Sequence, residues 1–306
     1  MKHFRPRSLM LVATLCCALA ASALFGCSQA APPDAAARPA SDVEAMGSLE
    51  AIEDPALEVE PEAAPEPEPE PESEAAPKPE AAEAVVVEQR IAEGDPTAKI
   101  CYLTLDDGPS DNTLEFLRVF EEKGVLATWF VQGNSAQIDR VVDIAAAGHG
   151  IGLHTYSHDY AQVYASDDAY FADLAAVQEA VSSRIGRTSD IVRFPGGTSN
   201  TVSANYSSGI MSRLTQSVPA AGYQYFDWNV SSGDASNPPL SAESIVANIL
   251  DNTGSMQRIC VLAHDTNAKG TTLEALPAVI DGLRAQGYTF GVLTRDTPPF
   301  QHQAGN

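Results

Sequence analysis

Several acidic and histidine side chains directly follow short apolar segments, and their types suit metal binding. Asp106 and Asp107 follow residues 100–105, and His154 and His158 follow a later apolar segment. Taken alone, a carboxylate pair before Gly-Pro favours a turn cap, and two histidines at this spacing are as often a pair on a helix surface. Two histidines and one carboxylate that face a common point would instead leave an open coordination position, as catalytic zinc sites do.

The segments that precede these residues are typical of strands because they are short and rich in β-branched and aromatic residues. Seven such segments are residues 100–105, 127–131, 150–153, 191–194, 223–229, 259–263 and 288–293. Segments with helical spacing lie between them, at residues 113–122, 168–185, 242–252 and 273–286. Strands that alternate with helices predict an α/β fold with a parallel sheet.

The number of these units favours a closed or nearly closed barrel. No Gly-x-Gly-x-x-Gly motif or phosphate loop supports a doubly wound sheet instead. The functional site of a barrel forms where the carboxyl ends of its strands meet. Asp106, Asp107, His154, His158 and His264 all stand at such strand ends. We therefore predict one polar site at this rim, with Asp107 and the first two histidines as metal ligands.

Five short segments, taken in order, carry a resemblance to a known family. They are Thr104 to Pro109, His154 to His158, Arg193 to Gly196, Trp228 to Asp234, and Leu262 to His264. On these segments the chain resembles the polysaccharide deacetylases with a NodB homology domain, carbohydrate esterase family 4, over nearly all of residues 98–294. The resemblance implies a distorted (β/α) barrel of seven to eight parallel strands. It also implies a divalent metal, usually zinc and sometimes cobalt or another first-row ion.

The resemblance assigns a role to each matched residue. Asp106 is expected to be the general base, and Arg193 is expected to orient it. Asp107, His154 and His158 are expected to bind the metal.

The remaining matched residues are expected to handle the acyl group and the leaving amine. The backbone N–H of Gly196 would bind the oxyanion, Leu262 would line the pocket for the acetyl methyl group, and His264 would be the general acid with Asp234 as its partner. Trp228 is expected at the pocket edge or in the core. The chain departs from the family at Gly196, where an aromatic residue is common, and at Ala235, where tryptophan is common. These departures alter the pocket walls and leave the metal and acid/base residues unchanged.

The implied function is hydrolysis of N-acetyl groups on an amino-sugar polysaccharide, such as peptidoglycan or a chitin-like oligomer. Metal-activated water would attack the amide, with an aspartate base and a histidine acid. Two alternatives stay open. The same machinery can remove O-acetyl groups from a polysaccharide such as xylan, and the chain can be a glycan-binding lipoprotein without catalysis.

The N-terminal region indicates export and attachment to a membrane. Lys2, Arg5 and Arg7 precede an apolar run that ends before Cys27, which is the pattern of a signal peptide. Residues 24–27 resemble a lipobox, so residues 1–26 are expected to be cleaved and Cys27 to carry lipid. An uncleaved anchor helix is the alternative. Either way we expect an extracytoplasmic protein attached to the cell membrane.

Composition separates a linker from the folded domain. Residues 32–84 contain 16 acidic and two basic residues, with many prolines and alanines, and such a segment cannot bury a core. We therefore expect a disordered linker at residues 27–84 and the catalytic domain at residues 85–306. The acidity of the chain argues against nucleic acid as a partner, and against membrane contact beyond the N-terminal lipid.

Other residues are expected to be structural. Cys101 and Cys260 are predicted to be buried free thiols, because strand alternation places them on opposite faces of the sheet. Trp129 is predicted to lie in the core. Asp265 is expected to line the rim or to be solvated, and His302 is expected in a frayed tail.

Overall fold

A computed structural model describes residues 79–306. The predicted signal peptide, the lipidation site Cys27 and most of the predicted linker lie outside the described residues. Between residues 79 and 306, no helix is both long enough and apolar enough to cross a membrane.

A parallel sheet of eight strands organises the domain. The strands are β1 Ile100–Asp106, β2 Thr128–Gln132, β3 Gly150–Thr155, β4 Ile191–Val192, β5 Gln224–Tyr225, β6 Val230–Ser231, β7 Arg258–His264 and β8 Thr289–Phe290. Their order across the sheet is β5-β4-β3-β2-β1-β7-β6, and β8 pairs with the start of β1. Every pairing is parallel, as the sequence predicts.

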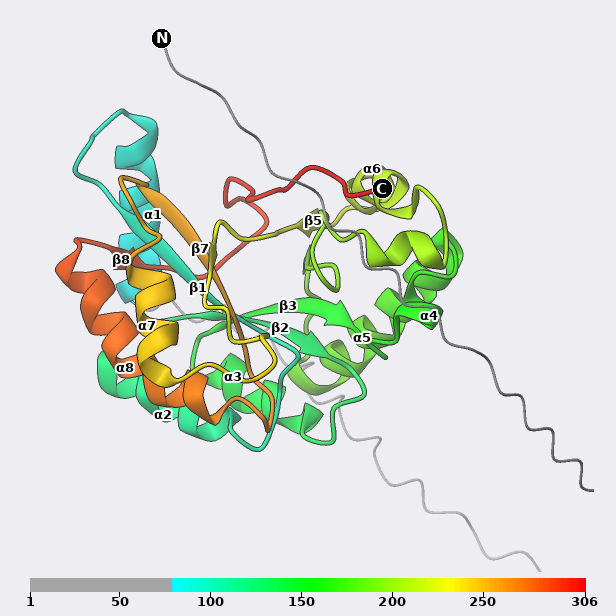
Figure 1. Cartoon of the computed structure of the whole chain (residues 1–306), viewed down its shortest axis with the longest axis horizontal. Helices are drawn as coiled ribbons and strands as arrows, with labels where there is room; N and C mark the ends of the chain where they lie inside the picture. Colours follow the sequence, from blue (N-terminus) through cyan, green and yellow to red (C-terminus); the bar gives the residue numbers. More distant parts are fainter. Residues whose placement is uncertain (1–78) are drawn as a thin grey trace, which may run out of the picture. The chain divides into compact units, whose positions relative to one another are not determined.

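The sheet is curled into an open barrel (Figure 1). β5 and β6 lie at opposite ends of the strand order, yet five residue steps join Tyr225 to Val230. Five steps span at most about 18 Å, whereas seven flat strands at about 4.8 Å spacing would be roughly 29 Å wide. The two edges must therefore approach each other, which confirms the predicted distorted barrel. The expectation of one strand at residues 223–229 was wrong, because the chain there leaves one edge and joins the other.

Most of the helices cover the outer face of the curled sheet. They are α1 Pro79–Ala92, α2 Thr113–Lys123, α3 Val141–Ala146, α4 Tyr160–Val163, α5 Asp167–Ile185, α6 Ile210–Ala220, α7 Ala242–Leu250 and α8 Gly270–Ala285, with 3-10 turns at Ile138–Arg140 and Val202–Asn205. In Figure 1, α2, α7 and α8 lie together on one side of β1 and β7. Serine side chains cap α5 and α7, since Ser166 and Ser241 accept hydrogen bonds from backbone N–H groups of the first turns.

Alternation along β1 separates the barrel interior from the helical layer. Cys101, Leu103 and Leu105 join the large core cluster beneath the helices. Ile100 and Tyr102 face the interior, where a second cluster includes Cys260. The two cysteines are thus free and buried on opposite faces, which confirms that prediction. The same alternation turns Thr104 and Asp106, further along the strand, toward the interior.

Helix α1 begins earlier than the predicted domain. Residues 79–84 belong to its first turns, so this part of the expected linker is helical. The local sequence Pro-Glu-Ala-Ala-Glu-Ala favours a helix by composition. Ala84 and Val87 are buried in the interior cluster, so α1 packs against the barrel beside β8.

Candidate metal and catalytic site

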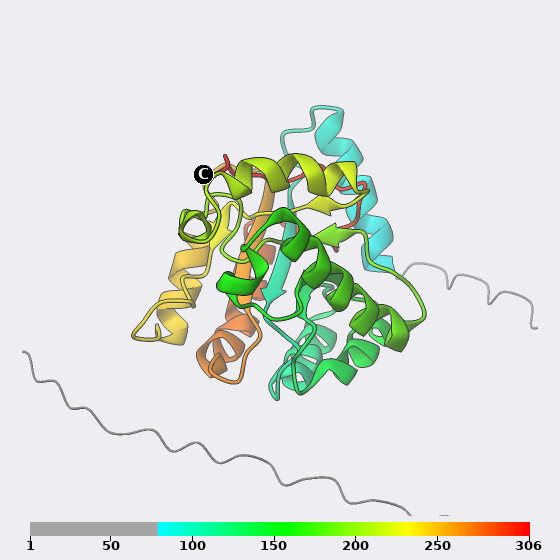
Figure 2. The same cartoon turned by 90° about the vertical axis from the view of Figure 1, so that its right-hand side faces the viewer.

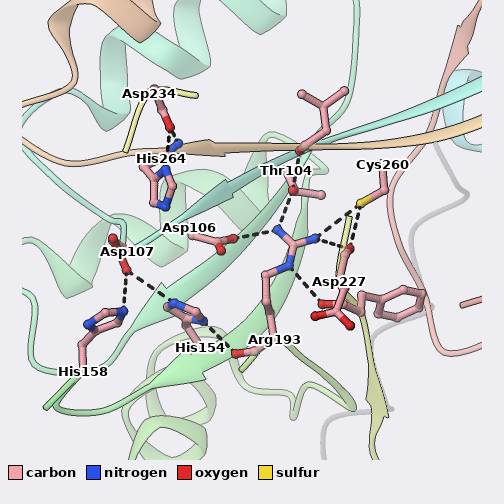
Figure 3. A network of polar contacts seen from close by, with 12 residues as sticks. Thr104, Asp106, Asp107, His154, His158, Arg193, Asp227, Asp234, Cys260 and His264 are labelled. Carbon is pink, nitrogen blue, oxygen red and sulfur yellow. Dashed lines mark hydrogen bonds and ion pairs between the residues drawn. The ribbon is translucent and has the colours of Figure 1, made fainter. Parts of the chain in front are cut away.

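Three predicted ligands lie together at the carboxyl ends of β1 and β3 (Figure 3). Asp107 Oδ1 lies 3.5 Å from His154 Nε2 and 3.3 Å from His158 Nε2. One ligand atom from each residue lies within 4.8 Å of the other two. Side chains at this separation can hold a single ion between them.

The chemistry of these atoms fits a divalent cation. Asp107 Oδ1 is buried and has no hydrogen-bond partner among the described residues. His154 Nδ1 lies 2.7 Å from the Arg193 carbonyl oxygen, and because a carbonyl can only accept, Nδ1 must carry the proton. The lone pair of Nε2 then points at Asp107, which is the tautomer that binds a metal. Burial lowers the pKa of His154, although the charges of Asp106 and Asp107 oppose this shift, so the neutral imidazole is favoured.

Unusual backbone conformations aim two of the ligands. Asp107 has φ of 69° and His158 has φ of 54°, a left-handed region that residues other than glycine rarely adopt. The hydroxyl of Thr155 accepts a hydrogen bond from His158 N at 3.0 Å and helps to hold that conformation. Within residues 79–306 these are the two non-glycine residues with positive φ. Such strain concentrates at functional sites because the surrounding structure must maintain it.

Arg193 holds Asp106 inside the barrel. Its guanidinium is fully buried and donates to Asp106 Oδ1 at 2.8 Å and to Thr104 Oγ1 at 2.6 Å. It also donates to the carbonyls of Phe226 and Asp227. Burial opposes the charged form, but Asp106 outweighs it and raises the pKa of Arg193. Removing one member of such a buried pair typically costs about 3–5 kcal/mol, so the position of Asp106 is firmly determined.

His264 and Asp234 form a second charged pair beside Asp106. His264 Nδ1 lies 2.7 Å from Asp234 Oδ1, and His264 N donates to Asp234 Oδ2 at 2.9 Å. Thr272 also donates to Asp234 Oδ2. Burial lowers the pKa of His264, but the Asp234 hydrogen bond and charge outweigh it and raise the pKa overall. The same pairing lowers the pKa of Asp234 despite its burial.

The register between β1 and β7 places the base candidate Asp106 directly beside the acid candidate His264. Asp106 on β1 pairs with His264 on β7. In Figure 3 the His264 ring lies between Asp234 and the pair Asp106 and Asp107 at the end of β1. One site therefore contains a candidate metal cluster, a carboxylate held by an arginine, and a histidine held by a carboxylate.

Comparisons with known proteins agree with this arrangement. A family model for polysaccharide deacetylases matches residues 93–210. The catalytic domain of a peptidoglycan N-acetylglucosamine deacetylase from Eubacterium rectale is 40% identical, with a TM-score of 0.66, and the match covers 68% of this chain and 94% of that one. The chain belongs to the polysaccharide deacetylase family.

Two curated members of the polysaccharide deacetylase family are also similar. A peptidoglycan-N-acetylglucosamine deacetylase of Bacillus cereus is 29% identical over 63% of this chain and 68% of its own length. A bifunctional xylanase/deacetylase of Pseudobutyrivibrio xylanivorans is 29% identical over 63% of this chain and 29% of its own length. Membership of this deacetylase family makes the chain an enzyme, a hydrolase that acts on polysaccharides.

The residues predicted to form the pocket of this deacetylase lie around the same site. Gly196 follows Arg193 in an exposed turn with φ of 74°, and its N–H has no acceptor among the described residues. Leu262 is buried on β7, two residues before His264. Trp228 is partly buried against the interior cluster, and its ring lies 5.1 Å from that of His302. Trp228 is thus partly in the core.

Asp227 is a structural carboxylate that the sequence analysis missed. It is fully buried and accepts hydrogen bonds from Thr198 N at 2.9 Å, from Thr198 Oγ1, and from His302 N at 2.8 Å. These contacts fasten the turn that carries Gly196. The sequence contained one signal of this role, because Asp227 is a charged residue inside the apolar segment 223–229.

The C-terminal segment is ordered, so the expectation of a frayed tail was wrong. His302 Nε2 lies 2.6 Å from the Trp228 carbonyl oxygen. The carbonyl of Asn306 accepts a hydrogen bond from Ser212 N on α6. Figures 1 and 2 show the last residues beside this helix. The segment therefore packs against the loops next to the site.

Asp265 and Trp129 form part of the support beneath the metal cluster. Asp265 is fully buried and accepts hydrogen bonds from Ser110, Thr113 and Trp129 Nε1. It therefore neither lines the rim nor faces solvent, because three donors compensate its burial. Trp129 lies in the core, as predicted.

Proposed function

We propose that this enzyme removes N-acetyl groups from an amino-sugar polysaccharide, with peptidoglycan as the favoured substrate. The observation that carries the proposal is the buried, unpartnered Asp107 Oδ1 facing His154 and His158. Beside it, Arg193 holds the Asp106 carboxylate in one ion pair, and Asp234 holds the His264 ring in another. A metal, a base and an acid are the groups that amide hydrolysis requires.

The proposed reaction adds one water to the amide and splits its C–N bond. A divalent ion held by Asp107, His154 and His158 would polarise the acyl oxygen and lower the pKa of water. Asp106 would take a proton from the water as its oxygen attacks the carbonyl carbon. Gly196 N–H would donate a hydrogen bond to the developing oxyanion. His264 would then protonate the departing amine nitrogen, which releases acetate and a free amino sugar.

Zinc is the proposed ion, with cobalt or another first-row metal as alternatives. Two imidazole nitrogens and one carboxylate, with the remaining position open, are typical of catalytic zinc. The second nitrogen of His154 is hydrogen-bonded to a backbone carbonyl, as metal-binding histidines usually are.

An open groove next to the metal cluster supports a polymeric substrate. It has a volume of about 440 Å³ and begins at Asp107. Most of the residues that line it are polar, among them Ser110, Gln132, Ser135, Gln137, Thr266 and Asn267. Amides and hydroxyls of this kind suit a hydroxyl-rich glycan. The similarity to peptidoglycan N-acetylglucosamine deacetylases favours a wall glycan.

Acetate release from purified full-length protein tests the proposal. The substrates are peptidoglycan, N-acetylglucosamine oligomers and acetylated xylan, each with and without a chelator. Chelator-sensitive release from the amino sugars supports the proposal. Release from xylan alone would favour an O-acetyl esterase, a second candidate suggested by the similarity to a xylanase/deacetylase. No release from any substrate would favour a glycan-binding protein without catalysis.

We further propose that the chain acts outside the cytoplasmic membrane, anchored by lipid on Cys27. The basic N-terminus, the apolar run and the cysteine after Gly26 support this. Mass spectrometry of the N-terminal peptide tests it, because an unmodified peptide that begins at Met1 would contradict the proposal.

Asp234→Asn should move the alkaline limb of the kcat profile to lower pH. Asp234 raises the pKa of His264, as do the charges of Asp106 and Asp107, and a general acid works only while protonated. Without the Asp234 charge, His264 loses its proton at a lower pH. At pH values above this lowered pKa, loss of the protonated acid would also lower kcat by about 100-fold. Kinetics between pH 5 and 10 would measure both effects.

The same pair should make the stability of the wild type depend on pH, and Asp234→Asn should lose this dependence. His264 stabilises the fold when protonated, and this contribution is lost as pH rises through its raised pKa, above 6.5. The Asp234 contribution is lost as pH falls through its lowered pKa, below 3.8. The pair therefore stabilises most between these values. The control is Asp281→Asn, a change at an exposed carboxylate. For the kcat profile, an alkaline limb that stays at the wild-type pH in Asp234→Asn would contradict the pairing of His264 with Asp234.

A further inference from the structure

Tyr160 stands next to the candidate metal cluster but has no role in the mechanism above. It is the first residue of α4, two positions after His158. Its ring centroid lies 5.9 Å from that of His158 and 5.2 Å from that of Tyr164. The side chain is therefore packed between a metal ligand and a buried aromatic residue, and it is itself only partly buried.

The hydroxyl of Tyr160 reaches the backbone of Gly196. A Cβ atom built on Gly196 would lie 2.5 Å from Tyr160 Oη, closer than real Cβ contacts. Position 196 therefore has no room for a side chain while Tyr160 is in place. The hydroxyl of Tyr160 thus occupies the space directly beside the proposed oxyanion donor.

The turn that carries Gly196 is held against these tyrosines. Tyr164 Oη donates to the Pro195 carbonyl at 2.8 Å, and Asn200 Nδ2 donates to the same carbonyl at 3.1 Å. The proximity of Tyr160 to Gly196 is therefore maintained by neighbouring contacts.

Two hydrogen-bond donors meet here without acceptors. Among residues 79–306, no protein atom is within hydrogen-bonding distance and geometry of Tyr160 Oη. The Gly196 N–H is equally unpaired within that range. Donors beside a cation site suit an oxygen that gains negative charge, since both strengthen as the charge grows.

We propose that the Tyr160 hydroxyl donates a hydrogen bond to the acyl oxygen of the bound acetamide, beside Gly196 N–H. This inference rests on the proposed deacetylase function. The ligand class is the carbonyl oxygen of an N-acyl group, and the bond strengthens as that oxygen becomes an oxyanion. The phenol keeps its proton throughout, so the reaction balance is unchanged.

Tyr160→Phe tests the inference because it removes the hydroxyl and keeps the ring. We expect kcat to fall by about 100-fold, the lower end of the cost of losing one oxyanion donor. KM should change little, because the contact is strongest in the transition state. Metal content and thermal unfolding should match the wild type, since no protein group loses a hydrogen bond. Tyr206→Phe is the matched control, because Tyr206 is exposed.

A double-mutant cycle tests the proximity to Gly196. Gly196→Ala places a Cβ against the Tyr160 hydroxyl and also strains the backbone at φ of 74°. The strain remains in the Tyr160→Phe background, but the clash does not. Gly196→Ala should therefore lower kcat less in that background than in the wild type. Equal losses in both backgrounds would contradict the proposed contact.

Acetate binding separates failure of this inference from failure of the proposed function. The zinc-loaded protein should bind acetate about 10-fold or more weaker after Tyr160→Phe, as expected for a lost hydrogen bond to a charged group. This measurement remains decisive even if the wild type releases no acetate from any glycan. A Tyr160→Phe variant with wild-type kcat and acetate affinity would overturn the inference and leave Tyr160 as a wall of the site.

Discussion

Asp106→Asn is expected to lower kcat for acetate release by about 10³- to 10⁴-fold, at the upper end of what loss of a general base costs. Asparagine has almost the same shape and can still accept a hydrogen bond from Arg193 through its amide oxygen. It cannot take a proton from water. Initial rates on N-acetylglucosamine oligomers would measure the effect, together with zinc content by elemental analysis.

The metal should remain bound in this variant, because Asp107, His154 and His158 are unchanged. Asp139→Asn is the control, since Asp139 is 87% exposed. A variant that keeps more than a tenth of wild-type kcat would assign the base to another group. If the wild type shows no measurable turnover and Asp106→Asn keeps wild-type function in the cell, the non-catalytic alternative is favoured instead.

His158→Ala should abolish both stoichiometric zinc binding and activity. Its Nε2 is one of three ligand atoms around Asp107 Oδ1, and two protein ligands hold zinc poorly. Loss of an outer-shell partner alone typically costs about 10- to 100-fold in metal affinity or activity, so loss of a ligand should exceed about 100-fold. Calorimetric zinc titration and acetate release would measure the two effects.

Restoring the metal distinguishes ligand loss from misfolding. Wild-type protein treated with a chelator should regain activity when zinc is added, whereas His158→Ala should not at the same zinc concentration. Circular dichroism should show that the variant is folded, because His158 is only partly buried. Full activity of the chelated wild type without added metal would contradict metal dependence altogether.

The candidate site could be predicted largely because of the parallel sheet. Parallel strands end at the same rim, so polar residues directly after separate strands converge there regardless of their distance along the chain. Asp107 and His158 are 51 positions apart, yet their side chains lie 3.3 Å apart. Short motifs and the periodicity of apolar residues show which polar residues directly follow strands, and this is enough to predict that they converge.

The supporting contacts could not be predicted in the same way. Asp227 binds Thr198 and His302, which lie on different loops. Asp265 binds Trp129 from another strand. Whether such a carboxylate is buried or solvated depends on which segments pack around it, and local sequence patterns do not specify that.

The sequence by itself determined the strand and helix alternation, the barrel class and the set of residues with the right chemistry, because all of these follow from periodicity and residue type. Only the tertiary structure decided that residues 223–229 hold β5 and the link to β6 at the other edge of the sheet, that α1 packs against the barrel through Ala84 and Val87, and that Tyr160 meets Gly196. These features depend on contacts between distant segments, whose geometry emerges only once the chain closes on itself.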